Sequence, residues 1–111
     1  MEVDHVININ TLRAYFRQNM VFVTEHAAER FRQRGIKIRD IQCAVDNGKI
    51  IEQYPHDFPF KSCLILGKDR QDVFMHVCMS DEGNMSKIVT AYYPDKNKWN
   101  SNFETRKENY L

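Results

Sequence analysis

Three side chains suited to handling phosphate are spaced at regular intervals in one segment of this 111-residue chain. His26, Arg30 and Arg34 lie four residues apart, so they fall at about 0°, 40° and 80° around a helix. Histidine exchanges a proton near neutral pH, and arginine stabilises developing negative charge. The spacing therefore predicts a phosphate-handling ladder on one side of a helix. The structural alternative is that His26 bonds to a strand while the arginines bridge to carboxylates.

Charge is unevenly distributed along the sequence. Residues 13–39 contain seven Lys or Arg against two Glu, a local charge of +5 in a chain whose total is +1. Six of the seven are arginines, the residue suited to bidentate phosphate contact. The low total charge is unlike that of a general nucleic-acid binder, and solvated basic helix faces would give the same local excess.

Several other chemistries are excluded by the residues present. The four histidines include no i, i+4 pair and no H-E-x-x-H, which argues against a zinc hydrolase. Three cysteines without a C-x-x-C pair argue against a disulfide framework. With no phosphate-binding glycine loop and no G-x-S-x-G, we expect no cofactor.

The elements that must position the ladder follow from periodicity and end signals. Apolar spacing predicts a helix over residues 8–19 with an Asn8 cap, and a second over 25–34 between Thr24 and Gly35. A third is predicted over 38–47. The pattern then alternates, which predicts strands over residues 49–54, 62–67, 73–79 and 87–93.

This order of elements defines a fold class and a domain plan. Helices followed by strands joined through short turns predict α+β, with N-terminal helices packed on one face of a four-stranded, mainly antiparallel sheet. We expect one domain over residues 1–111, whose other sheet face is concave and open. Trp99, Phe103 and Tyr110 in the tail from Pro94 predict that the tail docks on the sheet.

Two strand positions add candidate proton-transfer groups. His76 lies in the middle of the strand over 73–79, on the same face as Phe74 and Cys78. It is either a packed, hydrogen-bonded core residue or a second acid/base group near the open sheet face. Tyr92 and Tyr93 point to opposite faces, so only one of them can face a site, and Tyr92 is our candidate.

An ordered series of motifs is similar to that of a small bacterial domain family of unknown function, over about residues 22–99. This sequence differs from the family pattern in two places. It has Lys37 where the family usually has Ser or Thr near the helix start, and it has an extra N-terminal helix within residues 1–21. A C-terminal tail covers residues 100–111. The motifs are His26-Ala27-x-x-Arg30-x-x-x-Arg34-Gly35-Ile36, Asp40-Ile41, Gly48-Lys49-Ile50-Ile51-Glu52, Tyr54-Pro55, Ser62 to Gly67, Met75-His76-Val77, Thr90-Ala91-Tyr92-x-Pro94-Asp95 and Trp99.

The family's layout resembles the RelE/ParE-like toxin superfamily, including BrnT-type ribonuclease toxins. The resemblance implies a metal-independent endoribonuclease acting by 2′-hydroxyl attack on RNA, ribosome-bound RNA included, and silenced by an antitoxin. His26 would be the base, Arg30 and Arg34 the phosphate-holding cations, and His76 or Tyr92 the second proton-transfer group. The alternative is a non-catalytic protein- or nucleic-acid-binding module on the same scaffold. An immunity-like accessory protein is a third class.

The expected compartment is the cytoplasm. The sequence starts without a basic, apolar leader, and unbroken apolar runs such as Leu64-Ile65-Leu66 are far shorter than the ~20 residues that span a bilayer. The odd, unpaired set of cysteines is typical of a reducing environment. We therefore expect a cytoplasmic protein without a membrane partner.

Overall fold

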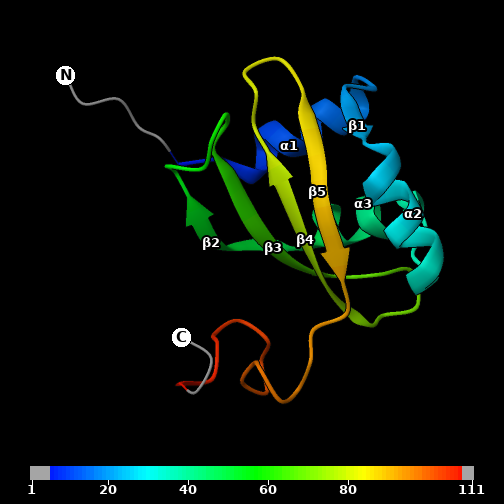
Figure 1. Ribbon diagram of the computed structural model, residues 1–111, viewed down its shortest axis with the longest axis vertical. Helices are drawn as coiled ribbons and strands as arrows, with labels where there is room; N and C mark the ends of the chain where they lie inside the picture. Colours follow the sequence, from blue (N-terminus) through cyan, green and yellow to red (C-terminus); the bar gives the residue numbers. More distant parts are fainter. Residues whose placement is uncertain (1–5, 109–111) are drawn as a thin grey trace.

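The computed structural model describes residues 6–108, which form three helices and five strands (Figure 1). Tyr110 lies outside the described residues. The helices are α1 (Ile9–Arg17), α2 (Glu25–Arg34) and α3 (Ile38–Asn47). The strands are β1 (Val21–Val23), β2 (Lys49–Tyr54), β3 (Ser62–Lys68), β4 (Phe74–Ser80) and β5 (Ser86–Tyr92).

The sheet is mixed and has one strand more than the sequence predicts. Its order is β1-β5-β4-β3-β2, and the three pairs from β2 to β5 are antiparallel, as expected of a meander. The strand that the sequence did not predict is β1. It pairs in parallel with β5, with Val21 opposite Ser86 and Val23 opposite Ile88. A three-residue strand whose partner lies more than 60 residues further along the chain leaves no local signal, so the α+β class is right and the four-strand count is wrong.

Local end signals set the helices as predicted. The Asn8 side chain accepts a hydrogen bond from the Asn10 amide (2.8 Å), and Thr24 accepts one from Ala27 (3.1 Å). Gly35 ends α2 at φ 69°, in the left-handed region that glycine enters without steric cost. At the start of α3, Lys37 makes no side-chain cap hydrogen bond.

The buried side chains of all three helices belong to one core cluster, together with Met75, Val77 and Met79 of β4. α1 and α3 lie behind the sheet in Figure 1, and α3 packs on β3 and β4. α2 packs beside β5 at the β1 end of the sheet, and its buried residues Ala27 and Phe31 contribute to the same core as α1 and α3. Its inward face is apolar, with Phe31 3% exposed in the core. The opposite side of α2 is therefore free to carry polar groups.

α3 crosses β3 at a position where only glycine fits. A Cβ built on Gly67 would lie 1.9 Å from the carbonyl oxygen of Ala44, and one on Gly48 would lie 2.4 Å from the same oxygen. Since these obstacles are backbone atoms, no side-chain rotation relieves the overlap. The two glycines therefore set how closely the helix approaches the sheet.

Two buried carboxylates tie the β3–β4 turn to the rest of the fold. Asp40, at the start of α3, accepts a hydrogen bond from Arg70 Nε at 2.9 Å, which is the main reason that its pKa lies below its usual value. Asp69 accepts a hydrogen bond from the Tyr93 hydroxyl at 2.8 Å, and burial together with this bond raises the pKa of Tyr93 to about 12. All these groups are satisfied within the protein, so they support the fold.

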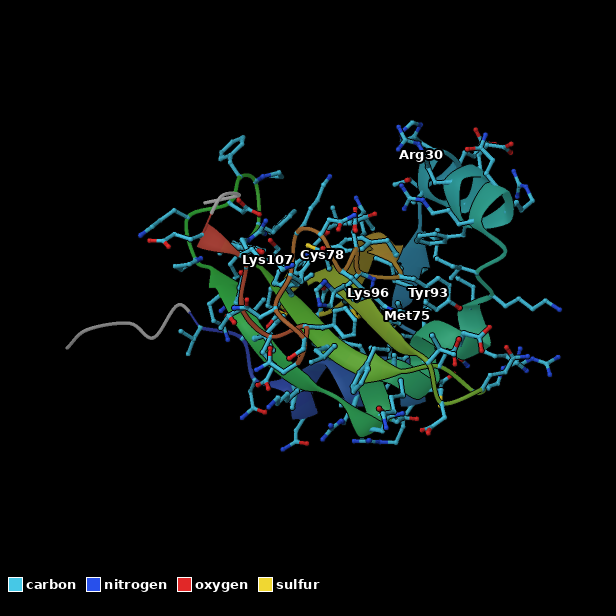
Figure 2. All side chains as sticks on the ribbon, turned by 90° about the horizontal axis from the view of Figure 1, so that it is seen from below. Arg30, Met75, Cys78, Tyr93, Lys96 and Lys107 are labelled. Carbon is cyan, nitrogen blue, oxygen red and sulfur yellow. The ribbon has the colours of Figure 1, made fainter. Side chains whose placement is uncertain are left out.

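The segment that begins at Pro94, called the tail from here on, covers part of the sheet face that was expected to be open. Trp99 is 4% exposed, which confirms the prediction that the tail docks on the sheet. Figure 2 shows the tail, in orange to red, on the side of the sheet opposite α1 and α3. The expectation of a fully open face is therefore wrong. Burying the aromatic side chains of the tail against the sheet removes apolar surface from water, which lowers the free energy of the folded state.

Candidate functional site

The α2 ladder, defined here as His26, Arg30 and Arg34, is on the surface as predicted. All three residues are exposed, and Arg30 points outward from α2 (Figure 2). Within residues 6–108, the side chains of His26 and Arg30 have no hydrogen-bond or ion-pair partner. These two groups are free to meet an external anion.

Arg34 is already engaged by the protein. Its Nη1 donates to the carbonyl oxygen of Ala91 at 2.8 Å and lies 3.4 Å from the Thr90 hydroxyl. This part of β5 extends beyond the residues that pair with β1, so the carbonyl oxygen of Ala91 has no strand partner on that side among the described residues and Arg34 supplies its hydrogen bond. Its structural role is thus evident, although its remaining guanidinium nitrogens can still contact phosphate.

The rest of the basic segment is dispersed by the fold. Arg13 donates to the carbonyl oxygens of Val45 (3.1 Å) and Gly48 (3.0 Å) and so closes the C-terminal end of α3. Arg32 forms an ion pair with Glu29 on the exposed side of α2. The local excess of positive charge therefore does not form one continuous patch.

His76 is a fully buried side chain, 0% exposed, on β4. Its Nε2 lies 2.8 Å from the carbonyl oxygen of Phe103, which can only accept, so Nε2 carries the proton. Nδ1 then accepts from the Tyr92 hydroxyl at 3.2 Å. The Trp99 ring packs edge-on against the imidazole, with centroids 4.4 Å apart. His76 therefore joins β4, β5 and the tail.

Burial decides the protonation of His76 and Tyr92. Desolvation lowers the pKa of His76, although the Phe103 carbonyl and the nearby Glu52 carboxylate oppose the change. Burial likewise raises the pKa of Tyr92. At neutral pH the imidazole is uncharged and the phenol keeps its proton.

A carboxylate and a guanidinium complete this sheet face, although the sequence analysis missed both as site residues. Arg106, in the tail, donates from Nε and Nη2 to the two oxygens of Glu52 at 3.2 Å, and the Tyr54 hydroxyl donates to the same carboxylate. Burial alone would raise the pKa of Glu52, but the bonds from Arg106 and Tyr54 outweigh it, so the pKa lies below its usual value. Glu52 is ionised at neutral pH.

We call Glu52, Tyr54, His76, Tyr92 and Arg106 the sheet-face cluster. The Glu52 and Arg106 side chains are 24% and 40% exposed, so both are accessible to a ligand, whereas His76 is not. Alternation along β2 places Glu52 and Tyr54 on one face of the sheet, and this could have been predicted from the sequence. The contact with Arg106, 54 residues away, has no signal in the sequence.

The predicted site residues fall into two separate groups. His26 is eight residues from Arg34, or about 12 Å along a helix, and Arg34 is the ladder residue that touches β5 next to Tyr92. His76 and Tyr92 contact each other, but neither contacts His26. The ladder and the sheet-face cluster are thus neighbouring surfaces, and they do not form a single constellation.

Comparison with known proteins gives a family without a function. The fold is α+β, with three helices and a five-stranded mixed sheet over the described residues. A family described as "Domain of unknown function (DUF4258)" matches residues 23–93, and the chain belongs to this family. No curated protein and no solved structure matches the chain.

Two further findings concern metals and membranes. Within residues 6–108, no three His, Cys, Asp or Glu side chains are grouped in a way that would hold a metal ion. No helix of this part of the chain is long and apolar enough to cross a bilayer.

Proposed function

We propose that this protein binds RNA and cleaves it without a metal at the sheet-face cluster. The observation that supports the proposal is the convergence, on one partly open sheet face, of an ionised carboxylate, a guanidinium and a protonated phenol. These are the groups needed to accept a proton, hold phosphate charge and donate a proton. RelE-like ribonuclease toxins, which the motif series resembles, are the corresponding class.

In the proposed reaction, the ribose 2′-hydroxyl attacks the adjacent phosphorus. The 2′-oxygen–phosphorus bond forms, the bond to the 5′-oxygen breaks, and the products are a 2′,3′-cyclic phosphate and a 5′-hydroxyl. Glu52 accepts the 2′-proton and Arg106 holds the phosphate charge. The Tyr92 hydroxyl turns away from His76 Nδ1 and gives its proton to the 5′-oxygen, and His76, which holds that hydroxyl beforehand, is a positioning residue.

The α2 ladder has a supporting role in this proposal. Arg30 and His26 are exposed and unpartnered, and Arg34 sits at the edge of β5, so the ladder offers a path for the RNA backbone towards the sheet. This role replaces the expectation that His26 is the base, because His26 is remote from Tyr92. Three free cysteines support the proposed cytoplasmic location.

The test is cleavage of single-stranded RNA in the presence of EDTA. We expect Glu52→Gln to reduce the rate by about 10²- to 10⁴-fold, as the loss of a general base does. The matched control is Glu104→Gln, because Glu104 is a tail carboxylate that pairs with Lys49 outside the cluster. Wild-type cleavage by Glu52→Gln, or an inert wild type, would contradict the proposal.

A second function, RNA binding without cleavage, is favoured by one specific observation. Glu52 and Arg106 are bonded to each other through two hydrogen bonds of 3.2 Å, as expected of groups that only hold the fold. Under this alternative, Arg30→Ala weakens RNA binding while no variant changes RNA integrity. Filter binding alongside the cleavage assay separates the two functions.

A further inference from the structure

The C-terminal tail forms a half-open pocket next to the sheet-face cluster. Its volume is about 390 Å³, within the range of roughly 300–1,000 Å³ usual for small-molecule sites. The residues around it all come from the tail, and two of them are labelled in Figure 2. The lining consists of Lys96, Trp99, Asn100, Ser101, Phe103 and Lys107.

The aromatic part of this tail pocket is held in place by the cluster. Trp99 packs on His76, and the Arg106 guanidinium lies 4.7 Å above its ring. Phe103 packs on Phe74 with ring centroids 5.6 Å apart, and its carbonyl accepts from His76. These rings need little reorganisation to meet a flat ligand.

Phe103 also has an unusual backbone. Its φ of 59° is in the left-handed region, which residues other than glycine rarely adopt. Its amide donates to the carbonyl of Asn100 at 2.8 Å, which fixes the turn that holds the ring at the pocket. Strain of this kind is found at ligand sites.

The pocket carries positive charge that the protein does not neutralise. Among the described residues, Lys96 and Lys107 have no ion-pair partner, whereas Lys49, Lys68 and Lys87 each have one. An aromatic wall next to free lysines matches the two halves of a nucleotide, a flat base and its phosphate.

We infer that the tail pocket binds one nucleotide of single-stranded RNA, with the base against Phe103 and the edge of Trp99, and the phosphate on Lys96 and Lys107. The inference rests on the proposed function, because it names the substrate group held next to the scissile phosphate. The pocket and the cluster share Trp99, and Arg106 contacts both Trp99 and Glu52.

The chain contains one tryptophan, so Trp99 reports directly on the pocket. The probes are 2′-O-methylated hexauridylate and hexaadenylate, which cannot be cleaved by 2′-hydroxyl attack, and the mononucleotides UMP and AMP. We expect each probe to change Trp99 fluorescence at saturation, with the hexamers binding more tightly. Ribose 5-phosphate, which lacks a base, should produce no change at the same concentration.

Surface variants test which side chains are responsible. We expect Lys96→Ala and Lys107→Ala each to weaken hexamer binding by about 3- to 10-fold and to reduce the slope of log K against log salt by about 0.7. Phe103→Leu should weaken binding roughly 5-fold or more through lost stacking. The matched control, Lys98→Ala, removes a tail lysine that does not line the pocket and should bind as wild type.

The outcomes separate this inference from the proposed function. Hexamer binding without a Trp99 signal, and with unchanged affinity in both lysine variants, would overturn the pocket while leaving RNA binding by α2 intact. Mononucleotide binding without hexamer binding would overturn the RNA assignment. A Trp99 signal lost in Lys96→Ala and Lys107→Ala, in a protein that cleaves no RNA, would support the pocket and contradict the cleavage proposal.

Discussion

Mild acid should destabilise this protein through His76. The imidazole is 0% exposed, and burial lowers its pKa from the ordinary value of 6.5. The unfolded chain therefore binds this proton first as the pH falls below 6.5, so the folding free energy that depends on the neutral ring is present above 6.5 and is lost below it. One proton gives at most about 1.4 kcal/mol per pH unit, and half of the unfolded chains already carry it at pH 6.5, so stability should fall by up to about 1 kcal/mol between pH 6.5 and pH 5.5.

The neighbours of His76 determine the design of the measurement. Tyr92 and the Phe103 carbonyl occupy its nitrogens, and the charges nearby are Glu52 and Arg106. Glu52 has a lowered pKa, so its own contribution is lost only below its ordinary value of 4.5. The window from pH 6.5 to 5.5 thus separates the contribution of His76 from that of Glu52.

Urea titrations followed by Trp99 fluorescence at several pH values provide the assay. His76→Gln retains an amide donor for the Phe103 carbonyl and should abolish the slope between pH 6.5 and 5.5. His26→Gln, at the exposed histidine, should retain it. A wild-type stability that does not change in this window, or a slope that survives in His76→Gln, would refute the reasoning.

Three other variants have defined expectations. Phe31→Ala should cost about 3–5 kcal/mol in a denaturant titration because the ring is 3% exposed in the core, and a loss below about 1 kcal/mol would contradict this packing. Gly67→Ala should lower the melting temperature or prevent folding, since its Cβ would lie 1.9 Å from a backbone oxygen of α3, and a wild-type melt would show that α3 can move away. Arg34→Ala should cost about 0.5–1.5 kcal/mol through its bond to β5, whereas Arg30→Ala should stay within about 0.5 kcal/mol, and equal melting temperatures would remove the distinction.

Local chemistry predicted most elements of the fold. Thr24 and Gly35 bound α2 as their side-chain and backbone properties require, and the alternating segments became β2 to β5 to within a residue or two. The exposure of His26 and Arg30 followed from the same helical geometry. Features whose cause lies within about ten residues were therefore accessible from the sequence.

Features that depend on residues far apart in the chain could not be predicted from the sequence. β1 is a strand only because β5 lies beside it, and Glu52 joins a site only because Arg106 folds back from the tail. His76 was placed on the correct strand, but its burial depends on Trp99 and Phe103, which lie 23 and 27 residues further along. Such contacts are decided by tertiary packing, which the periodicity of one segment does not encode.

The position of the tail has a practical consequence for anyone who would shorten this protein. The family match ends at residue 93, yet the guanidinium that neutralises Glu52 and the indole that shields His76 are both contributed by later residues. A truncation at that boundary would leave a charged carboxylate unpaired and an apolar sheet face in water. The matched segment therefore omits side chains that cover and neutralise the sheet face.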